Sequence, residues 1–115
     1  MLPGKNRLKR ADDFSKVFKK GRSISGDNLI VRFAANDYSY PRFGFSIGLK
    51  FSSLAPKRNR IKRQIRAALA VLLPEIKEGY DVVIMAKKSQ KTEISSFDVM
   101  KDLKELLKKA RLINI

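Results

Sequence analysis

A long segment between two prolines, Pro56 and Pro74, sets the tightest limit on how this chain folds. Proline suits the first position of a helix and also stops one, so the segment predicts a helix over residues 56–73. Its apolar side chains recur at helical spacing and gather on one side. This apolar face comprises Ile61, Ile65, Ala68, Leu69 and Leu72. Because such a face must be buried against another element, the remaining chain has to supply a partner surface.

The rest of this helix is densely basic. Six of the ten residues at 57–66 are Lys or Arg, and none is acidic. We expect Arg60, Arg63 and Arg66 on the side opposite the apolar face, and Lys62 on a flank. Cations in a first turn oppose the helix dipole, and neighbouring cations repel one another. A bound polyanion reverses both effects and explains the pattern better than the alternative, a solvated basic face.

The composition excludes much of catalytic chemistry. The 115 residues hold 26 Lys and Arg against 11 Asp and Glu, a net charge of +15, with no His and no Cys. There is therefore no disulfide, no thiolate nucleophile, no zinc site of the usual kind and no imidazole base. The charge predicts a polyanionic partner, of which nucleic acid is the commonest, over a merely soluble basic protein.

The other segments predict an α+β two-layer sandwich with the order α-β-β-β-α-β-α. Two further helices are expected at 11–20 and from Ser95 or Ser96 to about 110, and strands at 22–25, 29–35, 43–48 and 80–86. We expect strands 29–35 and 43–48 to pair as a hairpin, with the helices on one side of the sheet.

Three details of this fold are also predicted. Residues 1–10 hold four cations and no acid, which is typical of a flexible basic arm on a single domain of residues 1–115. The small residues Gly44, Ser46 and Gly48 allow either a helix or a ligand to approach closely. In the last helix we expect an ordinary solvated face, on which acidic residues balance part of the basic charge, and an apolar stripe. The acidic residues are Asp98, Asp102 and Glu105, and the stripe is Phe97, Met100, Leu103, Leu107 and Ala110, with Leu106 on its flank.

The polar start of the chain lacks the apolar stretch of a signal peptide, and the longest apolar run, 67–73, is far too short to cross a membrane. We therefore expect a soluble cytoplasmic protein without a membrane partner.

The run Arg58-Asn59-Arg60-Ile61-Lys62-Arg63, followed by Ile65-Arg66, resembles the signature helix of the bacterial ribonuclease P protein component family. Residues 7–9 and 13–21 resemble the family's N-terminal helix, 41–47 the strand before its signature loop, and 80–88 the strand after the signature helix. The resemblance spans nearly the whole chain. It implies an RNA-binding domain with an unusual left-handed βαβ crossover.

The resemblance also implies a function. The family's protein is an accessory subunit that binds a large catalytic RNA, and the complex hydrolyses one phosphodiester bond to remove the 5′ leader of precursor tRNA. Catalysis resides in the RNA with its Mg²⁺, so this chain is expected to supply no catalytic residue and no metal ligand, and to need no obligate protein partner. The implied RNA-subunit contacts are Lys50, Lys57, Arg58, Asn59, Arg60, Lys62, Arg63 and Arg66. The implied leader contacts are Phe14, Phe18 and Arg32, with Lys16 nearby.

The residues themselves leave alternatives open. Two aromatics on one helix, Phe14 and Phe18, are more often core, and only the resemblance assigns them to the leader. Family members often carry an aromatic where Arg32 stands, so a phosphate or guanidinium-stacking contact is expected there. The main competing function is that of a structural RNA-binding protein, such as a ribosomal protein. A nuclease acting alone is disfavoured, since two-metal hydrolysis needs carboxylates converging within about 4 Å of the ions.

Overall fold

The structure, a computed structural model, describes residues 2–88 and 94–113. The predicted α+β class and the order α-β-β-β-α-β-α are confirmed. The helices are α1 (Ala11–Lys20), α2 (Ala55–Leu72) and α3 (Ser96–Lys109), and the strands are β1 (Arg22–Ser25), β2 (Leu29–Ala35), β3 (Arg42–Ser46) and β4 (Tyr80–Ala86). Short 3₁₀ helices at Gly4–Asn6 and Leu73–Glu75 complete the elements. No helix in these ranges has the length and apolar character needed to cross a membrane.

The four strands form one sheet in the order β1-β2-β4-β3. The predicted hairpin between β2 and β3 is wrong: β2 pairs antiparallel with β1 and β4, and β3 pairs parallel with β4. The reason is that Val82, Val83 and Ile84 of β4 are fully buried, and a strand apolar on both faces takes a central place. The parallel strands β3 and β4 are joined through α2 and form a βαβ unit. This is the unit for which the family resemblance implies a left-handed crossover.

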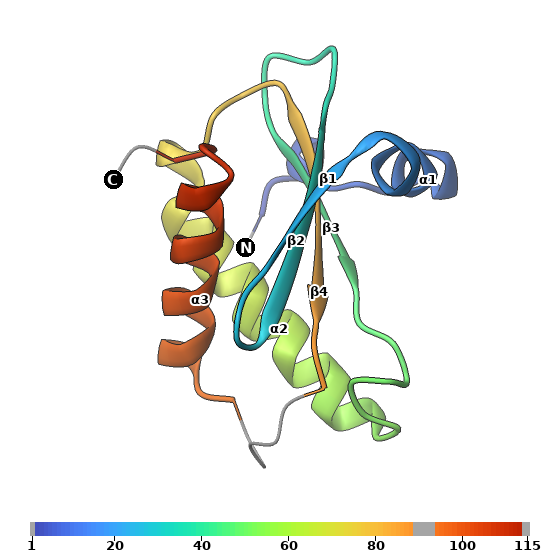
Figure 1. Cartoon of the computed structure of the whole chain (residues 1–115), viewed down its shortest axis with the longest axis vertical. Coiled ribbons are helices and arrows are strands. Elements are labelled where there is room, and N and C mark those ends of the chain that lie inside the picture. The colour runs from blue at the N-terminus through green and yellow to red at the C-terminus, as the bar shows by residue number, and fades with distance from the viewer. Residues whose placement is uncertain (1, 89–93, 114–115) are drawn as a thin grey trace.

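Both faces of the sheet carry helices (Figure 1). The prediction of one covered face holds for α2 and α3, and it is wrong for α1, which packs on the opposite face. Side chains alternate along a strand, so β4 serves both layers. Val82 and Ile84 pack in the larger core with α2 and α3, whereas Val83 packs with Leu8 and with Val17 of α1.

The predicted core face of α2 is confirmed, since all five apolar residues are buried. The stripe predicted for α3 is wrong at Phe97, which is 74% exposed, because Val99 takes the buried position in that first turn. Ser95 is the N-cap, and its side chain accepts a hydrogen bond from the backbone N–H of Asp98 at 3.0 Å.

The predicted flexible arm is wrong for residues 2–8. Leu2 and Leu8 are buried, and the Leu8 N–H donates to the Phe43 carbonyl at 2.8 Å, beside an isolated bridge between Arg7 and Phe43. Asn6 is buried too, and its Nδ2 donates to the carbonyl of Pro41 at 2.7 Å. Two leucines among the cations thus give this segment enough apolar surface to dock on the edge of β3.

The predicted solvated face of α3 is wrong at Asp102, which is 5% exposed. Its carboxylate accepts hydrogen bonds from the backbone N–H groups of Asn28 and Leu29 at 2.8 Å and of Asp27 at 3.3 Å. Because these N–H groups belong to the β1–β2 turn, Asp102 ties that turn to α3.

Candidate nucleic-acid interface

The outer surface of α2 carries most of the predicted RNA contacts. Its first turn holds no acidic residue, although an acid there is favoured by the helix dipole. The structure leaves Lys50, Lys57, Asn59, Arg60 and Arg63 exposed, and Arg58, Lys62 and Arg66 half-buried. One helix and the loop before it thus present seven cations and one amide to solvent.

The half-buried members of this set lie closer to the body of the protein than periodicity predicted. Arg66, expected opposite the core, lies instead on the flank beside β3, with its guanidinium 5.3 Å from the centre of the Phe45 ring. Arg58 donates to the carbonyl of Ser52 at 2.9 Å and so fastens the preceding loop to the helix. On the opposite flank, Gln64 donates to the carbonyl of Ile94 at 3.0 Å, which joins α2 to the segment before α3.

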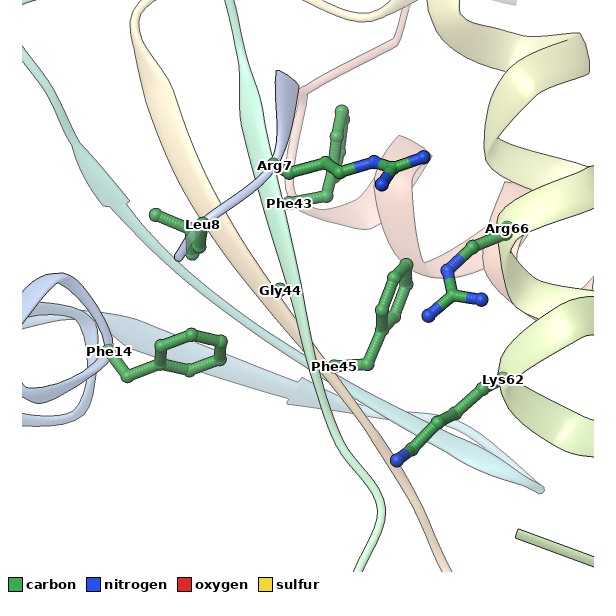
Figure 2. A pocket seen from close by; sticks show the side chains of 8 residues that line it. All are labelled: Arg7, Leu8, Phe14, Phe43, Gly44, Phe45, Lys62 and Arg66. Atoms are coloured by element: carbon green, nitrogen blue, oxygen red, sulfur yellow. The ribbon is translucent and has the colours of Figure 1, made fainter. Parts of the chain in front are cut away.

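A groove opens where the flank of α2 meets the exposed edge of β3 (Figure 2). Its lining comes from the N-terminal segment, α1, β3 and α2: Arg7, Leu8, Phe14, Phe43, Gly44, Phe45, Lys62 and Arg66. The sequence alone did not place Arg7 and Phe45 in a site, because their positions depend on the docking of the N-terminal segment on β3. The one signal in the sequence is the alternation of side chains along β3, which places Phe45 on the side of α2.

The predicted leader residues gather around α1. Phe14 is half-buried against β3, where a Cβ on Gly44 would lie 2.4 Å from its ring, so of the two alternatives left open for this glycine the structure shows a helix packed on it. Open space surrounds Gly48, with nothing within 4 Å of a Cβ there. Phe18 is 40% exposed and Lys16 is exposed, and both lie on α1 beside the sheet face that carries Arg32.

Arg32 has a role in the fold that the sequence did not reveal. Its Nε donates to the carbonyl of Val17 at 3.2 Å, a second nitrogen donates to the carbonyl of Phe18, and its guanidinium lies 6.0 Å from the centre of the Phe18 ring. These carbonyls belong to the last turn of α1, the negative end of the helix dipole. Arg32 therefore caps α1 and holds its C-terminal end on β2.

A second buried network, also missed, fixes α1 at its other end. Arg42 donates to both carboxylate oxygens of Asp81, at 2.8 and 2.7 Å, and lies 3.5 Å from Asp13 of α1. Hydrogen bonding to Asp81, with added attraction from its charge and that of Asp13, raises the pKa of Arg42 above its ordinary value. The Asn36 amide donates to the same Asp81 at 2.8 Å. The sheet face under α1 is thus held by charged hydrogen bonds as well as by apolar contacts.

The acidic residues that the structure describes are not grouped as metal ligands. Within residues 2–88 and 94–113, no three Asp or Glu side chains gather into a group that could hold an ion. The two buried carboxylates are already engaged, Asp81 by Arg42 and Asp102 by backbone N–H groups. These residues do not fit a Mg²⁺ site, whereas the cations of α2 fit a polyanion.

Comparisons with known proteins agree with this geometry. The model of the Ribonuclease P family matches residues 2–111. The ribonuclease P protein component of Pseudanabaena sp. (strain PCC 6903) is 38% identical, covering 99% of this chain and 98% of its own length. That of Clostridioides difficile (strain 630) is 37% identical and covers 89% of each chain.

Solved structures show the same fold. The Staphylococcus aureus RNase P protein superposes with a TM-score of 0.84 and 29% identity, covering 95% of this chain and 98% of its own. The Thermotoga maritima protein, in complex with 1-(4-fluorophenyl)-2-thiourea, gives a TM-score of 0.82 and 32% identity over 90% and 98% of the two chains. The chain, with its arginine-rich α2 and its sheet buried between helices, belongs to the ribonuclease P protein component family.

Proposed function

We propose that this protein binds the catalytic RNA of ribonuclease P and the 5′ leader of precursor tRNA, and thereby promotes removal of the leader in the cytoplasm. Family membership makes the protein an accessory subunit of this endoribonuclease. In the proposal, the groups that react at the phosphodiester bond belong to the RNA and its Mg²⁺. The chain's own residues bind and orient the two RNAs.

The observation that carries the proposal is the basic surface of α2 and its loop. Arginine predominates there, and its planar guanidinium forms paired hydrogen bonds with phosphate oxygens and stacks on exposed bases. Cations that repel one another in the free protein are each neutralised by phosphate in the complex. Binding should therefore weaken steeply with salt, because each phosphate contact releases condensed counterions.

A different surface supports leader binding. Phe18 and Lys16 are exposed on α1, and Phe14 and Arg32 lie beneath them against the sheet. An exposed aromatic beside a cation suits an unpaired strand, since a base stacks on the ring while the cation attracts the phosphate. This surface lies on the opposite side of the sheet from α2 and α3, which supports a main leader surface distinct from the main surface for the RNA subunit.

Reconstitution tests the proposal directly. The protein is added to a bacterial ribonuclease P RNA at low Mg²⁺ with precursor tRNA, and 5′ cleavage is measured. We expect strong stimulation of cleavage, and tighter binding of precursor than of mature tRNA. Binding of the RNA without stimulation would instead indicate a purely structural RNA-binding protein.

A matched pair of double variants tests the surface of α2. Arg60→Ala with Arg63→Ala should weaken binding of the RNA subunit and leave the helical content unchanged. Lys101→Ala with Lys104→Ala removes the same charge from exposed positions of α3 and should have a much smaller effect. Equal losses of affinity would mean that only the net charge matters, and lost helical content in the first variant would show a structural role for the arginines.

A further inference from the structure

The groove at the edge of β3 lies between the two surfaces described above. It shares Lys62 and Arg66 with the basic surface of α2, and Phe14 with the leader contacts on α1. Three cations from two distant parts of the chain converge there, Arg7 from the N-terminal segment and Lys62 and Arg66 from α2. Figure 2 shows their charged ends around the ring of Phe45. The lining contains no carboxylate, so an anion is the ligand that its charge calls for.

Two of the three cations, Arg7 and Arg66, are held in place before any ligand arrives. The Nε of Arg7 donates to the carbonyl of Leu2 at 3.2 Å, and the guanidinium of Arg66 lies over the Phe45 ring at 5.3 Å. Holding a long side chain in its binding position reduces the conformational entropy lost when the ligand binds. The groove is therefore organised for binding, unlike a set of freely moving surface lysines.

The edge of β3 adds a backbone donor. The carbonyl of Phe43 accepts from the N-terminal segment, so Phe43 directs its backbone groups away from β4. Hydrogen-bonding direction alternates along a strand, and Phe45 therefore directs its N–H toward the same edge, beyond the short bridge at Arg7. A backbone N–H among three cations suits a phosphate oxygen.

The residues that line the groove favour an unpaired strand over a duplex. A duplex stacks its bases inside, whereas an unpaired strand can place a base on the half-exposed Phe45 ring and its phosphate among the cations. The lining also includes Phe14, which the leader contacts on α1 share. The groove thus continues from the α1 side of β3 around its edge to the flank of α2.

We propose that this groove binds a nucleotide of the single-stranded 5′ leader, with Arg7, Lys62 and Arg66 holding its phosphate and Phe45 contacting its base. The inference rests on the proposed leader binding and extends it. The strand leaves the α1 surface, crosses the edge of β3 and ends against α2. Arg7 and Phe45 are then leader-binding residues, and α2 contacts the substrate as well as the RNA subunit.

Binding of precursor tRNAs with leaders of increasing length to the reconstituted holoenzyme tests this proposal. For long leaders, Arg7→Gln should reduce affinity about tenfold and lower the slope of log affinity against log salt by about 0.7. Phe45→Leu should also reduce affinity about tenfold, with no change in the salt slope. For leaders too short to reach the groove, both variants should match the wild type.

Two control variants make the result specific. Arg10→Gln removes the same charge three residues away, outside the groove, and Phe97→Leu makes the same change at an exposed aromatic on α3. Both should behave as wild type at every leader length. Equal losses of affinity in Arg7→Gln and Arg10→Gln would contradict binding of the leader in this groove. A loss in Arg7→Gln that is the same for every leader length would contradict it as well.

Direct measurement of affinity for the RNA subunit separates the remaining explanations. The proposal expects Arg7→Gln and Phe45→Leu to bind the RNA subunit as the wild type does, and weaker binding would assign the groove to that RNA instead. If the affinity of the wild-type holoenzyme for precursor tRNA does not depend on leader length, the proposed leader binding is wrong as a whole. If both variants keep the wild-type dependence on leader length, only the assignment of the leader to this groove is wrong.

Discussion

Asp102 shows how a single buried carboxylate can organise a turn. It receives three backbone N–H groups from the β1–β2 connection, and a Cβ at Gly26 would come within 2.7 Å of one of its oxygens. Lys87 donates to the carbonyl of Gly26 at 2.7 Å and closes the same turn from the end of β4. The turn is therefore held by charged hydrogen bonds, and the one glycine in it makes room for the carboxylate.

Replacing this carboxylate should destabilise the protein strongly. Asp102→Asn keeps the size of the side chain, but it removes the charge and turns one acceptor into a donor that faces backbone N–H groups. We expect the free energy of unfolding in urea to fall by about 2–3 kcal/mol. Glu105→Gln, the same change at an exposed position of α3, should cost almost nothing. Similar small effects in both variants would refute the anchoring role.

Arg32 is a second single residue with a large structural effect, because it caps α1. A variant that keeps its charge separates this capping role from its predicted role as a leader contact. Arg32→Lys keeps the cation but cannot donate to the carbonyls of Val17 and Phe18 together. The amide of Gly21, which donates to Val17 at 2.8 Å, should then exchange its hydrogen several-fold faster as the helix end frays. Arg22→Lys on β1 is the control. Unchanged exchange in Arg32→Lys would show that Arg32 does not cap the helix.

At the scale of elements, α2 combines a face built for stability with a surface built for a partner. The apolar face of α2 is buried in the core, and the sequence predicted all five of its residues. The basic first turn opposes the helix dipole in the free protein, and that turn itself contains no acidic residue. If α2 binds RNA as proposed, part of the stability of the isolated protein is exchanged for RNA affinity.

This exchange predicts opposite changes in stability and in binding. Lys57→Gln should raise the free energy of unfolding by about 0.3–1 kcal/mol at low salt and weaken binding of the RNA subunit. Lys104→Gln removes the same charge from α3, away from any helix start, and should change neither quantity much. The stabilisation should shrink at high salt. If Lys57→Gln proves less stable than the wild type, the dipole argument is wrong.

Helical periodicity and strand alternation predicted the element order, the strand over 80–86 and the buried face of α2, because each depends on local patterns. Pairing depends on competition between distant segments, and β4 displaced β3 from β2 because β4 has apolar residues on both faces. The same limit explains the candidate site. The signature helix was found from local charge, whereas Arg7 and Phe45 required knowledge of which strand lies at the edge.

For the whole molecule, the second face of the sheet depends on one ionic network. Asp81 of β4 holds Arg42 of β3 and the Asn36 amide after β2, and Arg42 also approaches Asp13 of α1. Three elements and the turn after β2 are thus linked through one carboxylate whose side chain is 8% exposed. Because the apolar core under α1 is small, the position of α1, and with it the proposed leader surface, depends on this network.

Asp81→Asn should therefore loosen the whole second face. Removing the charge of Asp81 leaves Arg42 with the longer ion pair to Asp13, at 3.5 Å, so we expect a loss of about 3 kcal/mol in the free energy of unfolding. Hydrogen exchange should accelerate more in α1 than in α2 or α3, since α1 is the one of these three helices that packs on that face. Asp13→Asn, which removes the longer contact alone, should cost less than about 1 kcal/mol. Uniform acceleration across all three helices would mean that the network stabilises the fold as a whole and does not position α1.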